Sequence, residues 1–319
     1  MSAPDVATLV ARARDGDARA VGRLISLVEN GSEHLREAMK ALAAQPGHAR
    51  VIGLTGSPGV GKSTSTAVLV AAFRARGQRV AVLAVDPSSP FSGGALLGDR
   101  VRMQEHATDA GVYIRSMASR GHLGGLAWST PQALRVLDAA GCDVVLVETV
   151  GVGQAEVEVA SLADTTLVLV APGMGDGIQA AKAGILEIAD VFVVNKADRD
   201  GADATARDLR HMLSLAEGRK PEDWQPPIVK TVASRNEGID DLMAALDKHQ
   251  EWLEQSGRLD ARRRVRAADE IEAIAVTELR TRMGDLRDGQ LLDELAGQVV
   301  AGTTDPYAAA DQLVASVTG

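Results

Sequence analysis

The feature that most constrains this chain is a glycine-rich stretch that directly follows an apolar run. Residues 51–55 are VIGLT, which is typical of a buried strand, and residues 56–64 are GSPGVGKST. A strand followed by G-x-x-x-x-G-K-[ST] and an apolar helix is the pattern of a phosphate-binding loop, whose backbone N–H groups surround a polyphosphate. We therefore expect nucleotide binding by Gly56, Ser57, Pro58, Gly59, Val60, Gly61, Lys62, Ser63 and Thr64.

Two side chains of this loop have specific expected roles. Lys62 would reach the β- and γ-phosphate oxygens, and the hydroxyl of Ser63 would take one Mg²⁺ position. A glycine-rich turn without a ligand is the alternative. We favour nucleotide binding because the glycine spacing, the lysine, the serine and the apolar helix that follows all agree.

A second pattern, further along the chain, predicts which base is bound. The apolar run 191–194 leads into Asn195, Lys196, Ala197 and Asp198, which form N-K-x-D. The carboxylate of Asp198 can accept two hydrogen bonds from the N1–H and the exocyclic amine of guanine, and adenine offers neither donor there. An ordinary turn with a helix N-cap at Asp198 or Asp200 is the alternative. A further base-side element is expected after the strand 228–232, at Ser234, Arg235 and Asn236.

The metal and the γ-phosphate are expected to lie at the ends of two other strands. Glu148 and Gly151 follow the apolar run 144–147, and Asp86 ends the run 80–85. Asp99 is a further candidate ligand, although a helix N-cap explains it equally well. Hard Mg²⁺ prefers carboxylates, water and phosphate oxygens, so the predicted metal ligands are Ser63, Asp86, Asp99 and Glu148.

The expected reaction is phosphoryl transfer to water, which needs positioning and charge stabilisation more than covalent chemistry. The predicted catalytic residues are Lys62, Glu148, Gly151 and Gln154. Gln154 is the candidate for orienting water, but its spacing from Gly151 differs from that of the glutamine in small GTPases. We therefore expect slow hydrolysis by the isolated protein, accelerated when a partner orders the loops.

Strand-like and helical segments alternate between residues 50 and 247. The expected strands are 51–55, 80–85, 112–116, 144–148, 166–171, 191–195 and 228–232. This alternation predicts an α/β fold, with a mostly parallel sheet sandwiched by helices and the ligand loops at the carboxyl ends of the strands. We expect three regions: an N-terminal helical extension (1–49), a nucleotide domain of the P-loop type (50–247) and a C-terminal helical arm (248–319).

Longer strings resemble a known family. Residues 86–103 (DPSSPFSGGALLGDRVRM), 117–127 (MASRGHLGGLA) and 148–160 (ETVGVGQAEVEVA), together with NKAD, resemble the MeaB/ArgK GTPases that accompany methylmalonyl-CoA mutase. The resemblance implies a GTPase, with Mg²⁺ and GTP or GDP as ligands, that loads and protects this adenosylcobalamin-dependent mutase without holding cobalamin itself. It also implies a homodimer joined through the C-terminal helices.

The resemblance further implies a switch segment that touches the mutase. The glycine-rich loop 173–179 follows the strand 166–171, and with Lys182 it could move with the nucleotide state. The candidate contacts are Asp176, Gln179 and Lys182. A flexible connector is the alternative for this loop.

Charge and composition restrict the partners. The net charge of −9 argues against nucleic acid, whose binding needs clustered Lys and Arg. The one basic cluster, Arg262, Arg263, Arg264 and Arg266, is expected to be a solvated or interface face. We expect no membrane segment and no signal peptide, a single quiet core thiol at Cys142 and a cytoplasmic location.

Other classes of function remain open. A metal-delivery GTPase should carry a His-rich or Cys-containing metal motif, which one cysteine and six dispersed histidines do not supply. A small-molecule kinase would need a site that selects ATP, whereas N-K-x-D favours guanine. A regulatory module that holds GTP without significant turnover is the strongest rival to an enzyme.

Overall fold

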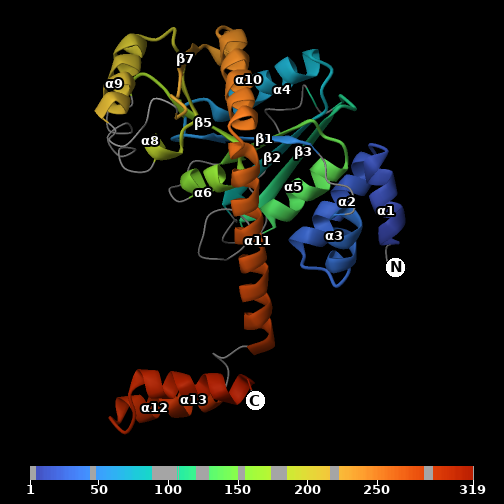
Figure 1. Cartoon of the computed structure of the whole chain (residues 1–319), viewed down its shortest axis with the longest axis vertical. Helices are drawn as coiled ribbons and strands as arrows, with labels where there is room; N and C mark the ends of the chain where they lie inside the picture. The colour runs from blue at the N-terminus through green and yellow to red at the C-terminus, as the bar shows by residue number, and fades with distance from the viewer. Residues whose placement is uncertain are drawn as a thin grey trace. The chain divides into compact units, whose positions relative to one another are not determined.

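The protein is built on a seven-stranded sheet in which every pair of neighbouring strands is parallel (Figure 1). The computed structural model describes residues 5–43, 48–87, 106, 108–119, 129–149, 155–173, 185–215, 223–283 and 290–318. The strand order is β3-β2-β4-β1-β5-β6-β7. The strands are β1 (Arg50–Thr55), β2 (Val80–Pro87), β3 (Val112–Ser119), β4 (Val144–Thr149), β5 (Thr165–Val170), β6 (Val191–Asn195) and β7 (Ile228–Thr231).

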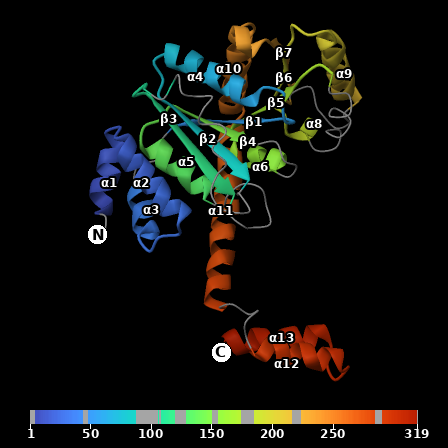
Figure 2. The same cartoon turned by 180° about the vertical axis from the view of Figure 1, so that it is seen from behind.

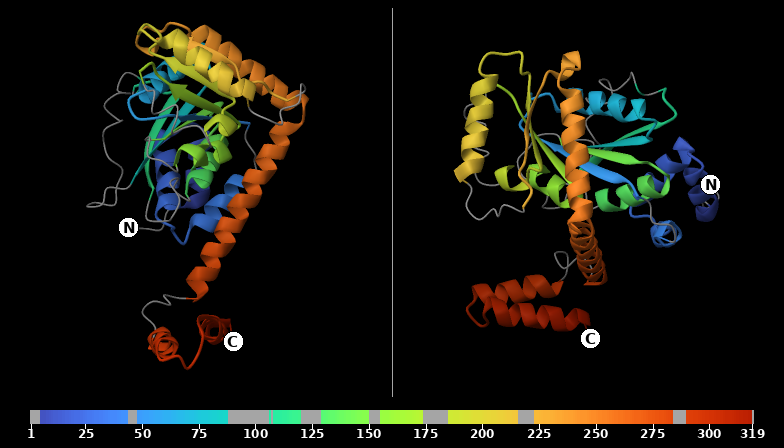
Figure 3. Two further views of the ribbon diagram at one scale, coloured as in Figure 1. Left: turned by 90° about the vertical axis from the view of Figure 1, so that its left-hand side faces the viewer. Right: turned by 45° about the horizontal axis from the view of Figure 1, so that its top comes forward.

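Helices cover both faces of the sheet, which explains why its central strands are continuous runs of buried β-branched and other apolar residues. Helices α4 (Lys62–Ala75) and α10 (Ile239–Gln255) lie together on one face (Figure 3), where Leu69, Phe73 and Leu246 pack on β1, β2 and β4. The other face carries α5 (Thr130–Ala139), α6 (Ala155–Leu162) and α9 (Ala202–Leu215); the four-residue α8 (Ile185–Ile188) precedes β6. The predicted fold class is thereby confirmed.

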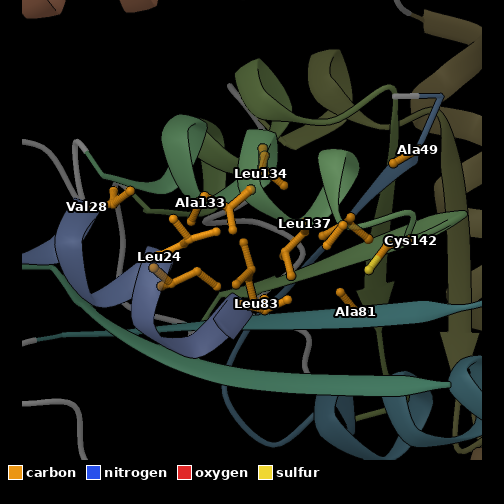
Figure 4. Close-up of a cluster of buried hydrophobic side chains, with 14 of the residues drawn as sticks. Leu24, Val28, Ala49, Ala81, Leu83, Ala133, Leu134, Leu137 and Cys142 are labelled. Atoms are coloured by element: carbon orange, nitrogen blue, oxygen red, sulfur yellow. The ribbon is translucent and has the colours of Figure 1, made fainter. Parts of the chain in front are cut away.

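Three N-terminal helices pack beside α5, at one side of the sheet in both views (Figures 1 and 2). They are α1 (Val6–Arg14), α2 (Ala18–Glu29) and α3 (Leu35–Ala43). Aspartates cap the first two, since Asp5 accepts from the N–H of Thr8 and Asp17 from those of Arg19 and Ala20. Leu24 and Val28 of α2 project into the same core as Leu83 of β2 and Leu137 of α5 (Figure 4), so these helices share the core of the nucleotide domain.

The same core contains Cys142, which is 8% exposed (Figure 4). Burial raises the pKa of its thiol from an ordinary value of 9.0 to about 11. Because only the thiolate reacts, alkylation of the folded protein at pH 8 should be about 100-fold slower than alkylation of the urea-unfolded chain. Stopped-flow labelling with a maleimide measures both rates on this single thiol, and equal rates would contradict a buried Cys142.

The edge of the sheet where β5 and β6 begin is held to α11 (Arg258–Met283) by two buried aspartates. Arg262 donates to both carboxylate oxygens of Asp190 at 2.8 and 2.9 Å, and Arg263 donates to Asp164 at 2.9 Å. His249 of α10 is fully buried there, with Nε2 3.2 Å from Asp190. The expectation of a solvated or interface face is therefore wrong for Arg262 and Arg263, because each pairs with an aspartate far away in the sequence.

These contacts also bear on where the nucleotide domain ends. We expected the C-terminal arm to begin at residue 248, but the chain separates into compact units at Arg263 and Arg264. Leu253 is fully buried, and α10 continues to Gln255 with its apolar face on the sheet. The first unit therefore includes the start of α11.

The second unit, Arg264–Gly319, is helical. It contains the remainder of α11, then α12 (Gln290–Val300) and α13 (Pro306–Thr318), which bury Leu295 and Ala309. Asp305 caps α13 by accepting from the N–H groups of Tyr307 and Ala308. None of the helices within the described ranges combines the length and the apolar character that a bilayer span requires.

Candidate functional site

The loop between β1 and α4 is packed so closely that two of its glycines cannot be replaced. Gly56 and Gly61 have backbone φ values of +141° and +98°, which L-residues with a side chain rarely adopt. A Cβ atom on Gly56 would lie 2.3 Å from the carbonyl oxygen of Leu169, and one on Gly61 would lie 2.4 Å from Nδ2 of Asn195. The loop is thus held against the ends of β5 and β6, at the carboxyl edge of the sheet.

Lys62 begins α4 and bends back over this loop. Its Nζ donates to the carbonyl oxygens of Gly56 at 2.6 Å and Ser57 at 3.2 Å, and the residue is only 7% exposed. Its ammonium group and the N–H groups at the start of α4 thus lie at the same end of the loop, where both would attract a polyphosphate.

Ser63 and Glu148 meet inside the protein. The Ser63 hydroxyl donates to Oε1 of Glu148 at 2.7 Å, and Thr66 donates to Oε2 at 2.9 Å. Glu148 is 1% exposed. A hydroxyl beside an ionisable carboxyl group is the donor set that a hard divalent cation prefers, so the residues present fit Mg²⁺. Thr66 was missed in the sequence analysis, although it lies one helical turn after Ser63 on the same face of α4.

Several predicted site residues, or their side chains, lie outside the part of the chain that the structure describes. The backbone of Asp86 lies near the end of β2, two residues after Ala84, which is in register with Glu148 of β4. Its carboxylate lies outside the described side chains. Within the described part of the chain, no three His, Cys, Asp or Glu residues lie close enough to hold a metal ion. Outside the described residues lie Asp99, Gly151, Gln154, Asp176, Gln179 and Lys182.

The N-K-x-D segment is joined directly to the phosphate-binding loop. Nδ2 of Asn195 donates to the carbonyl oxygen of Val60 at 2.8 Å, and Nζ of Lys196 donates to that of Gly59 at 2.6 Å. Oδ1 of Asn195 accepts from the Thr231 hydroxyl and from the N–H of Ala233, both at 3.1 Å. Two patterns that are far apart in the sequence therefore form one site.

Asn195 also ties the predicted base-side loop after β7 into the site, through those contacts with Thr231 and Ala233. Thr231 was not singled out from the sequence, and the strand end it occupies was the available signal. Within that loop, Ala233–Arg235 form the short 3₁₀ helix η2. Arg235 donates to Oδ2 of Asp198, whereas Ser234 and Asn236 are exposed.

Comparisons with known proteins agree with this geometry. Residues 21–286 match the family described as "Methylmalonyl Co-A mutase-associated GTPase MeaB". A Pyrococcus abyssi protein with a provisional GTPase name is 48% identical over 313 residues, covering 98% of this chain and 96% of that protein. The Escherichia coli protein named GTPase ArgK is 39% identical over 263 residues, covering 80% and 78%. A crystal structure of an LAO/AO transport system kinase is 28% identical, covers 100% of both chains and has a TM-score of 0.73.

Proposed function

The chain belongs to the MeaB family of methylmalonyl-CoA mutase-associated GTPases, and from that premise we propose that it binds and hydrolyses GTP. The observation that carries this proposal is the connection of Asn195 and Lys196 to the carbonyl oxygens of Val60 and Gly59. It joins a base-reading segment to a phosphate-binding loop. A bound nucleotide would therefore meet both segments at once, with its base beside Asp198.

The residues of this chain would assist GTP hydrolysis mainly through their charge and their position. Lys62 would exchange its contacts with Gly56 and Ser57 for the β- and γ-phosphate oxygens, where its charge stabilises the transition state. The backbone N–H groups of the loop would hold the phosphates in line for attack by water. Gly151 and Gln154 remain our candidates for contacting the γ-phosphate and orienting that water.

Magnesium would be held by Ser63 and Glu148. Both residues are buried and hydrogen-bonded to each other, so they would offer the ion two oxygen ligands that the fold already holds close together. When bound, Mg²⁺ neutralises charge on the β- and γ-phosphate oxygens. Thr66 keeps the Glu148 carboxylate oriented while Ser63 exchanges partners. Asp86 and Asp99 are proposed as further carboxylates of this site.

We further propose that GTP turnover serves an adenosylcobalamin-dependent methylmalonyl-CoA mutase, in cofactor loading and protection. The family description supports this partner, since it names the mutase. The segment 173–182 follows β5, whose end contacts the phosphate-binding loop through Leu169 and Gly56. Asp176, Gln179 and Lys182 would there respond to the nucleotide and contact the mutase.

A homodimer through the C-terminal helices is also part of the proposal. Helix α11 carries large apolar side chains that are exposed to water in the single chain: Val265 is 62% exposed, Ile271 68% and Leu279 58%. Burying such side chains against a second copy of the chain would remove this apolar surface from water.

The decisive experiment measures phosphate release from GTP and from ATP with Mg²⁺, with and without the mutase. We expect slow release from GTP alone, faster release with the mutase, and release near background from ATP. The Lys62→Ala variant sets the background. Release from neither nucleotide in either condition would leave a GTP-binding module without turnover, and the proposed hydrolase would be rejected.

A further inference from the structure

The carboxylate expected to recognise guanine already has a partner within the chain. Arg235 donates to Oδ2 of Asp198 from the loop that follows β7, and its other terminal nitrogen lies 3.7 Å from Glu237. The side chains of Arg235 and Asp198 are 55% and 34% exposed. The pair therefore lies on the accessible side of the site, where the base would arrive.

The turn that carries Arg235 is well defined by its backbone. The N–H of Arg235 donates to the carbonyl oxygen of Val232 at 2.9 Å, and Val232 exchanges hydrogen bonds with Glu237. Gly238 closes the turn with φ +74°, and a Cβ atom there would lie 2.1 Å from the carbonyl oxygen of Lys230. Because this turn is also tied to Asn195 through Ala233, it presents Arg235 to Asp198 from a fixed position.

The chemistry of the pair resembles that of the expected ligand. Guanine presents a ring N–H and an amine N–H to a carboxylate, and a guanidinium group presents parallel N–H donors in the same way. A carboxylate that already shares its charge with a guanidinium group is a weaker acceptor for the neutral donors of a base. Guanine would thus have to displace Arg235, or share Asp198 with it.

We infer that Arg235 is a specificity-determining residue that competes with guanine for Asp198. This inference rests on the proposed function, because it assumes that Asp198 binds guanine. Adenine has an amine beside a ring nitrogen that only accepts, so it cannot present the two adjacent donors that would displace the arginine from Asp198. Arg235 therefore lowers the affinity for guanine slightly. Because it occupies the Asp198 carboxylate, it also prevents other bases from binding there.

Arg235→Ala should bind GDP about two- to fivefold more tightly than the unmodified chain, the range expected for loss of an exposed ion pair. Isothermal titration calorimetry with GDP and Mg²⁺ measures this change. Arg199→Ala is the matched control, since it removes the same charge from the turn that follows Asp198. The control should not tighten binding, because general loss of positive charge disfavours a diphosphate.

A double-mutant comparison separates the inference from the function on which it rests. In an Asp198→Asn background, Arg235→Ala should give no further gain, because the competing carboxylate is gone. Equal or weaker GDP binding by Arg235→Ala, with a clear loss in Asp198→Asn, would overturn the competition while leaving guanine recognition intact. Unchanged GDP binding in Asp198→Asn would overturn both.

Discussion

Asp198→Asn is expected to change the preferred base from guanine to xanthine. The carboxylate would accept from two guanine N–H donors, and the substitution places an amide N–H₂ opposite one of them. Loss of a bidentate base contact costs about 1–3 kcal/mol, and a buried donor facing another donor adds to the loss. GTP should therefore bind about 10- to 100-fold more weakly. Xanthosine triphosphate should gain affinity by a similar factor, because it carries an oxygen where guanine has its amine.

Competition titration of both nucleotides against a fluorescent GDP analogue measures this exchange. Asp200→Asn is the matched control, because it removes the same charge from an exposed position in the same turn. The control should bind GTP and xanthosine triphosphate as the unmodified chain does. Unchanged GTP affinity in Asp198→Asn would show that Asp198 does not recognise the base.

The parts of the site that could be predicted share one property, which is that they follow short buried strands. Thr55 and Asn195 are the last residues of β1 and β6, and Glu148 is the residue before the last of β4. Each follows a run of apolar residues, so its position was visible in the sequence. Parallel strands place all such ends at one edge of a sheet. That rule alone brings residues 56–64 close to residues 195–198.

The contacts that were missed depend on partners far away in the chain. Arg262 and Arg263 have acidic neighbours in sequence, which suggested a solvated helix face, but they pair with Asp190 and Asp164, 72 and 99 residues away. Local periodicity carries no information about such pairs. The same is true of Thr66, whose hydroxyl has a role only because β4 brings Glu148 beside α4.

Asp190, which is buried beside the start of α11, gives the largest expected effect on stability. Asp190 is 6% exposed, accepts from the backbone N–H of Thr166 at 2.8 Å, and faces both Arg262 and His249. Asp190→Ala would leave the N–H of Thr166 and the guanidinium group of Arg262 without this acceptor. Removing one partner of a buried ion pair costs about 3–5 kcal/mol, and we expect a loss near the lower end of that range because the Arg262 side chain is 39% exposed. Urea unfolding followed by circular dichroism should show a loss of this size.

Asp203→Ala is the matched control, since Asp203 pairs with Lys230 and the two side chains are 74% and 45% exposed. This variant should lose much less stability than Asp190→Ala, because water screens an exposed pair. A similar loss in both variants would contradict the distinction between a buried and an exposed aspartate.

The pH dependence gives an independent check on Asp190. Burial alone would raise the pKa of its carboxyl group, but the hydrogen bonds and charges of His249 and Arg262 outweigh burial and lower the pKa below its ordinary value of 3.8. A lowered pKa stabilises the folded protein above the unfolded-state pKa, and this contribution is lost as the pH falls through the folded-state value. The charge-dependent part of the Asp190→Ala penalty should therefore be complete near pH 7 and shrink as the pH falls below about 4. A penalty that stays constant down to that range would show that packing at Asp190, and not its charge, holds α11 to the sheet.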